Sequence, residues 1–150
     1  MSFYRFVFGL LFGKRLPRLA GKITVEGPEY PISIDRDRWG IPYIRSKSVR
    51  DGWFGLGFCQ GQDRSFQLEI IQRISRGTLS EMIGRPGLSV DRLSRRIGFQ
   101  RSSNEQMKVL DEETRSYLRA YSEGVNSGRS QGSIKKAHEF TLLRCEPSIF

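Results

Sequence analysis

The side chains in this sequence whose types could act as a nucleophile and a base are two cysteines and one histidine. Cys59 lies in an apolar stretch, and the lone His138 precedes Cys145 by seven positions. A thiol beside an imidazole can form a nucleophile–base pair, but one residue of each type is a weak signal for that chemistry. The neighbours Trp53 and Phe58 favour a buried, inert thiol at Cys59. Whether a disulfide joins the two cysteines stays an open question.

Asp63 and Glu69 are the acids that come closest to a candidate acid–base pair. On a helix they would lie about one and two-thirds turns apart, so they would not share a face. Asp63 is placed to cap a helix, and Arg64 to bond nearby carbonyl groups or a carboxylate. The ligand spacings of zinc sites and calcium loops do not occur. We therefore expect no catalytic, ligand-binding or metal-binding residue and no cofactor in this chain.

The chain is strongly basic, with a net charge of +9 and a pI near 10.1 over 150 residues. A basic balance favours acidic partners. The densest basic stretch is compatible with a solvated helix face or with a face paired to another chain or domain; it contains Arg92, Arg95, Arg96 and Arg101. Zinc-finger, RNP and KH signatures do not accompany it, so we expect no nucleic-acid partner.

Residues 1–21 form a basic N-terminal arm that differs from the rest of the sequence. No acid precedes Glu26, and apolar residues recur at helical spacing: Phe3, Phe6, Val7, Leu10 and Leu11. The apolar run is too short to cross a bilayer. It fits a helix on a membrane surface, a short signal peptide, or a disordered or domain-capping arm. We therefore divide the chain into this arm and a partial domain over residues 22–150.

One hairpin and a series of helices must position the candidate residues. Alternating residues predict a β-hairpin over Ile32–Arg45, with Gly40 in the connection. Ser48 is a predicted N-cap, and a separate helix is predicted to start at Asp63 and to end at Gly77. The remaining predicted helices are Leu79–Ile83, Val90–Ile97, Ser102–Leu110 and Glu112–Asn126.

Caps and glycines refine these predictions. Thr78 and Glu81 fit a capping box, and Ser89 fits a cap for the helix that follows it. Three glycines near the start of the first long helix indicate close backbone packing against another element: Gly52, Gly55 and Gly57. The last long helix has Leu118, Tyr121 and Val125 on one predicted face. Its end is predicted from Gly124, Gly128 and Gly132.

Six short motifs follow one another along the chain: Arg36–Ile44, Asp51–Glu69, Arg76–Glu81, Asp91 with Arg95, Ala120–Asn126, and Glu139-Phe140 with Glu146-Pro147. In this order they resemble the penicillin acylase (penicillin amidase) family of N-terminal-nucleophile hydrolases. The resemblance runs from about Gly21 to Pro147. Three positions depart from the family pattern: Tyr43 replaces a histidine, Gly61 an alanine and Ser65 a large apolar residue.

The resemblance implies a fold and a reaction. Members are precursors, or zymogens, that cleave themselves into an α and a β chain. The β chain begins with a serine whose own α-amino group acts as its base, and amide groups stabilise the oxyanion. The products are a carboxylic acid and an amine. The implied fold class is α+β, a four-layer αββα sandwich, of which this chain would be a mainly helical fragment with one hairpin.

Only the first part of the α chain is covered by the resemblance. The chain is therefore expected to be the inactive N-terminal fragment of a hydrolase that cleaves linear amides, such as acyl side chains of β-lactam antibiotics, with the serine nucleophile downstream. Ser2, Ser127 and Ser133 do not lie in the family's nucleophile context. The implied partners are the rest of the α chain, the β chain and an acyl-amide substrate.

The resemblance also implies calcium in the complete enzyme and favours a periplasmic, secreted or membrane-associated location. A different class of function remains as the alternative. In that reading the chain is a non-catalytic basic helical module that binds an acidic partner or a membrane surface.

Overall fold

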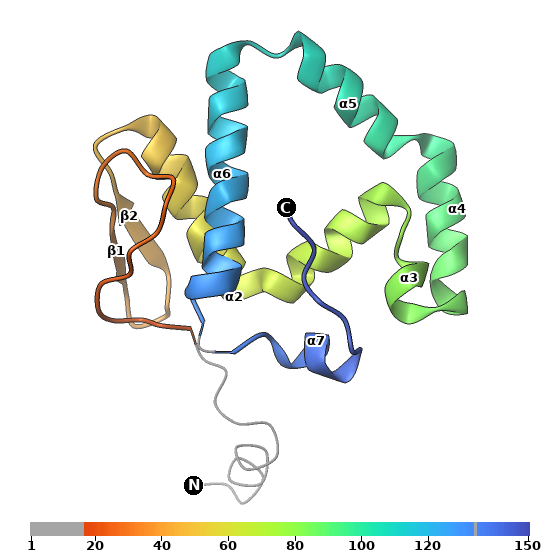
Figure 1. The fold of residues 1–150 in the computed structure, drawn as a ribbon, viewed down its shortest axis with the longest axis horizontal. Helices are drawn as coiled ribbons and strands as arrows, with labels where there is room; N and C mark the ends of the chain where they lie inside the picture. The colour runs from red at the N-terminus through yellow and green to blue at the C-terminus, as the bar shows by residue number, and fades with distance from the viewer. Residues whose placement is uncertain (1–16, 134) are drawn as a thin grey trace, which may run out of the picture.

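A computed structural model describes residues 17–133 and 135–150, so the helical pattern predicted over residues 3–11 of the N-terminal arm lies outside the described residues. Figure 1 shows a hairpin beside a set of helices. The elements are β1 (Ser33–Arg36), β2 (Pro42–Arg45), α2 (Val49–Arg76), α3 (Ser80–Ile83), the 3-10 turn η1 (Arg85–Gly87), α4 (Leu88–Ile97), α5 (Phe99–Val109), α6 (Glu112–Gln131) and α7 (His138–Leu142). The prediction of a mainly helical chain with one hairpin is confirmed. None of the described helices is long and apolar enough to cross a membrane.

The hairpin is antiparallel and pairs Ser33 with Arg45 and Arg36 with Pro42. Its connection contains Gly40 at a φ of +83°, a left-handed conformation that glycine adopts without a Cβ clash. Ile34 lies on the face that packs against the buried side chain of Phe54. The predicted hairpin and its glycine turn are confirmed.

Helix α2 begins and ends where local signals predict. Its N-cap Ser48 accepts a hydrogen bond from the backbone N–H of Asp51, and Gly77 ends it in the left-handed conformation. The prediction of a second helix starting at Asp63 is confirmed to within one residue. Two helical segments meet at a kink inside α2, where the φ of −131° and ψ of 25° at Arg64 are non-helical. Asp63 does not act as a cap, because its carboxylate is bound by Arg36 of the hairpin.

Helices α2 and α6 cross with their backbones in contact. A Cβ at Gly57 would lie closer than 3.0 Å to the carbonyl oxygen of Tyr121, and one at Gly124 equally close to that of Phe54. Gly61 and Gly128 repeat this relationship one turn further along. Close packing at Gly57 was predicted and is confirmed.

The predicted end of the last long helix is wrong. Gly124 and Gly128 lie inside α6, which continues to Gln131, because these glycines face α2 rather than ending the helix. The predicted apolar face also needs correction. Val125 is buried against α2, whereas Leu118 is exposed. The glycines, not a full stripe of large side chains, define the contact.

The caps predicted for the short helices are wrong. Helix α3 begins at Ser80 without a side-chain cap, and α4 begins at Leu88, before the predicted cap Ser89. Helix α5 begins at Phe99, three positions before its predicted start. An acid from α4 binds the backbone N–H groups of Leu79 and Ser80 at the start of α3, and the Glu81 N–H donates to the Thr78 carbonyl rather than to its side chain.

Candidate functional site

Arg36 of β1 makes the first polar cluster, at the kink of α2. Its guanidinium donates to both carboxylate oxygens of Asp63, at 2.8 and 3.1 Å, and to the Gln62 side-chain oxygen at 2.8 Å. Gln62 in turn donates to the backbone carbonyls of Arg18 and Gly132, at 2.8 and 2.6 Å. This two-pronged arginine–carboxylate contact is a strong and directional one. It ties the hairpin, the helix kink, the N-terminal segment and the end of α6 together.

Glu69 is the centre of a second cluster and is 0% exposed. Its carboxylate accepts from Nε of Arg73 at 2.7 Å and from the backbone N–H of Ser148 at 2.9 Å. The Ser148 hydroxyl donates to the same carboxylate at 3.0 Å. Arg129 of α6 lies 3.6 Å away. The donors that surround this buried carboxylate satisfy it and fix the segment around Ser148 onto α2.

Arg129 and Asn126 of α6 make further contacts with the segment of residues 148–150. Arg129 donates to the Ser148 carbonyl at 2.6 Å, and its guanidinium carbon lies 5.6 Å from the centroid of the Phe150 ring. Asn126 accepts from the backbone N–H of Phe150 at 2.9 Å and donates to its carbonyl at 3.3 Å. Burial lowers the pKa of Arg129 from its usual value, and the charge of Glu69 opposes that shift. These contacts place residues 148–150 in one position between α2 and α6.

Asp91 of α4 forms a third cluster, at the end of α2. Its buried carboxylate accepts from the backbone N–H of Leu79 at 2.7 Å and of Ser80 at 2.9 Å. Burial alone would raise the pKa of Asp91, but the hydrogen bonds from Ser80 and Leu79 and the charge of Arg95 outweigh it and lower the pKa. Asp91 thus caps α3, although it lies 11 positions after Ser80 in the sequence.

These acids bind arginine side chains and backbone N–H groups rather than one another. Asp63 and Glu69 belong to different clusters, as their spacing predicts, and neither faces a second carboxylate. Within residues 17–133 and 135–150, no group of three or more histidine, cysteine, aspartate or glutamate side chains could hold a metal ion. The arrangement is suited to holding segments in place, and the described residues contain no assembled acid–base pair.

The thiols are free. Cys59 is buried on α2, as predicted, and burial raises its pKa, so little of the nucleophilic thiolate forms. Cys145 is half-buried, and no disulfide joins it to Cys59. The open question of a disulfide is thereby answered. Among the serines considered as nucleophiles, Ser127 lies inside α6, Ser133 pairs with Pro17 in an isolated bridge, and Ser2 lies outside the described residues.

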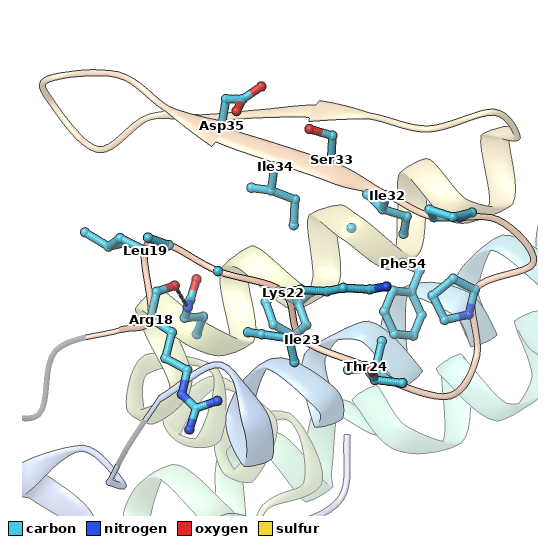
Figure 2. Close-up of a pocket in the computed structure, with 18 of the residues that line it drawn as sticks. Arg18, Leu19, Lys22, Ile23, Thr24, Ile32, Ser33, Ile34, Asp35 and Phe54 are labelled. Atoms are coloured by element: carbon cyan, nitrogen blue, oxygen red, sulfur yellow. Dashed lines mark hydrogen bonds between the residues drawn. The ribbon is translucent and has the colours of Figure 1, made fainter.

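A cavity of about 770 Å³ lies between the N-terminal segment, the hairpin and α2. Figure 2 shows Ile32 and Ile34 directed towards Phe54 beneath the hairpin, with Ser33 and Asp35 directed away. Lys22 and Arg18 come from the N-terminal segment. Sequence reasoning missed this hollow, although the alternation of Ile32 and Ile34 marked the inward face. Its size is that of a small-molecule pocket, and its lining combines apolar residues with charged and hydroxyl side chains.

The sequence model of the penicillin amidase family matches residues 31–150. This chain belongs to the penicillin amidase family. The chain is 36% identical over 132 residues to a penicillin acylase 2 proenzyme of Pseudomonas sp. (strain SE83), which covers 88% of the chain and 17% of that protein. It is 33% identical over 112 residues to an acyl-homoserine lactone acylase, QuiP, of Pseudomonas fluorescens, covering 75% of the chain and 14% of that protein.

A solved penicillin acylase structure shares this fold. The chain aligns with the thermostable penicillin G acylase from Alcaligenes faecalis with a TM-score of 0.68 and 23% identity, over 80% of this chain and 65% of that one. The chain therefore has the fold of part of a penicillin acylase. It spans less than a fifth of the length of the curated relatives that it matches.

Proposed function

We propose that this chain is the N-terminal part of the α chain of a hydrolase that cleaves linear acyl amides. The single observation that carries the proposal is the family match over residues 31–150, which contains all six motifs in order. Relatives are named for acting on penicillin and on acyl-homoserine lactones. Both substrates hold an acyl group on an amide nitrogen, so an acyl-amide is the substrate class that the relatives have in common.

The clusters around Arg36, Glu69 and Asp91 support a scaffolding role for this part of the enzyme. In each cluster the charged side chains are hydrogen-bonded to neighbouring backbone or side-chain groups. None of these side chains is therefore positioned as a nucleophile or a base. The nucleophile would be a serine at the start of a β chain released from the precursor, with its own α-amino group as base. A four-layer sandwich would form only when this chain joins the rest of the α chain and the β chain.

A structural calcium ion is proposed for the complete enzyme. The described residues gather no group of three or more suitable ligands, so the ligands would come mainly from outside them. No step of the reaction is assigned to that ion.

The proposal is tested with the longer precursor and the 150-residue chain side by side. Both are assayed with 4-nitroanilides that carry aromatic, short and long acyl groups. The precursor product should hydrolyse at least one, and alanine at the serine that becomes N-terminal should abolish hydrolysis. The 150-residue chain should hydrolyse none. Hydrolysis by the 150-residue chain, lost on substitution of one of its own residues, would overturn the proposal.

A further inference from the structure

Helix α4 is oriented with polar residues inward and apolar residues outward. Asp91 and Ser94 are 4% and 3% exposed, whereas Leu93 and Ile97 are 57% and 52% exposed. An amphipathic helix on a finished globular surface normally buries its apolar stripe. The orientation of α4 is the reverse.

Polar contacts set this orientation. Asp91 binds the backbone N–H groups of Leu79 and Ser80, and Arg95 donates to the Gly77 carbonyl at 2.8 Å. These bonds join α4 to the end of α2 and to α3, and they would be lost if the helix rotated to bury Leu93. The exposed apolar residues are therefore a fixed feature of the fold.

Cations flank the exposed apolar residues. Arg92 and Arg96 lie one turn apart beside Leu93 and Ile97, and we call these four residues the α4 face. Within residues 17–133 and 135–150, no carboxylate is ion-paired with either arginine. Apolar residues combined with arginine are typical of protein interfaces. The α4 face is therefore complementary to a partner surface that has apolar residues at its centre and acidic groups at its edge.

We propose that the α4 face is an interface for a later segment of the same precursor, one with an apolar centre and acidic edge. This inference rests on the proposed function, which makes the chain part of a longer polypeptide. The chain covers 17% of the proenzyme relative and 65% of the matched penicillin acylase chain, so most of the protein surface of such an enzyme lies outside it. Figure 1 places α4 and α5 on the side of the molecule away from the hairpin, with α4 beside α3 at the end of α2.

Charge disfavours a second copy as the occupant. Two copies meeting through this face would bring Arg92 and Arg96 of one against the same cations of the other, on chains of net charge +9. An anionic membrane would satisfy the cations as well. The fold match to a longer enzyme favours protein, and the experiment separates the two.

The test measures the accessibility of a thiol placed on the α4 face of the mature enzyme made from the longer precursor. Ile97→Cys is made in a Cys145→Ser background, and the rate of maleimide labelling is measured in the native enzyme and in urea. Ser94→Cys, already buried in α4, gives the rate of a protected thiol, and the urea rate gives that of a free thiol. We expect Ile97→Cys to label at least 100-fold more slowly in the native enzyme than in urea.

Charge variants test the acidic edge with the same readout. Arg96→Glu should raise the labelling rate of the cysteine at position 97 at least tenfold, while Arg119→Glu, an exposed cation on α6, should leave it within twofold. A native labelling rate within threefold of the urea rate would overturn the proposal. So would protection that develops only with phosphatidylglycerol vesicles, or only as the enzyme concentration rises. Hydrolysis of acyl nitroanilides is measured separately on the parent enzyme, so failure of the proposed function is seen independently of the labelling result.

Discussion

The Glu69 carboxylate binds both the backbone N–H and the hydroxyl of Ser148, 79 positions later in the chain, at 2.9 and 3.0 Å. The same carboxylate is paired with Arg73 and lies beside Arg129. One buried charge therefore joins α2, α6 and the segment after α7. This contact, together with the packing of Phe140 on Phe66, fixes the far end of the described chain.

Replacing Glu69 with glutamine should destabilise the protein strongly. Glu69→Gln would leave Arg129 buried without its counter-charge, and breaking one side of a buried ion pair costs about 3–5 kcal/mol. Urea unfolding followed by circular dichroism measures the loss. Glu81, which is 66% exposed and also contacts Arg73, gives the matched control. Glu81→Gln should cost at most about 1 kcal/mol, and equal effects of the two changes would contradict this account.

Alanine at Gly57 should separate α2 from α6. The added Cβ would lie closer than 3.0 Å to the Tyr121 carbonyl oxygen, a backbone atom that cannot move alone. Overpacking of this kind typically lowers the free energy of unfolding by about 1–3 kcal/mol. Gly52→Ala, on the same helix, would meet only the Ser46 hydroxyl at 3.3 Å and should be neutral or stabilising. Thermal melts compare the melting temperatures of both variants with that of the parent. A Gly57→Ala protein as stable as the parent would show that the helices are not in backbone contact.

Lysine cannot replace Arg36 in the hairpin. It keeps the charge but loses the pair of parallel bonds to Asp63 and the bond to Gln62. Arg36→Lys should cost about 1.5–3 kcal/mol, the range for hydrogen bonds to charged groups. Arg45, an exposed arginine that pairs with Asp35 across the same hairpin, is the control, and Arg45→Lys should have little effect in the same urea titration.

The lowered pKa of Asp91 makes a pH-dependent contribution to stability. Because the pKa is lower in the folded than in the unfolded chain, the contribution is present above the unfolded value of about 3.9 and is lost as the pH falls through the folded value. The melting temperature should therefore fall below about pH 4, and Asp91→Asn should fall less steeply there. Parallel curves for both proteins between pH 6 and 2.5 would show that Asp91 does not contribute.

Local signals in the sequence predicted the features that depend on a few neighbouring residues. The hairpin turn at Gly40 and the caps at Ser48 and Gly77 are of this kind, because each requires only a permissive backbone or one nearby donor. The predicted thiol burial at Cys59 also followed from its apolar neighbours.

Features that depend on distant partners were missed. Gly124 is both a typical helix-ending residue and a typical contact residue, and only the glycines of α2 opposite it show which role applies. Asp63 had the sequence context of a cap, but Arg36 lies close enough to bind it. The cap of α3 comes from Asp91, beyond any local capping pattern. The partners of Asp63, Glu69 and Asp91 come from distant parts of the sequence, so only the fold identifies them.

The most direct test of the central claim is intact mass and N-terminal sequencing of the protein purified from its source cells. The account predicts two chains cut from a longer precursor. The first would contain this sequence and the second would begin with serine. A single chain of 17.3 kDa that unfolds cooperatively and does not hydrolyse acyl amides would contradict the account, and the basic helical module would then be the function to pursue.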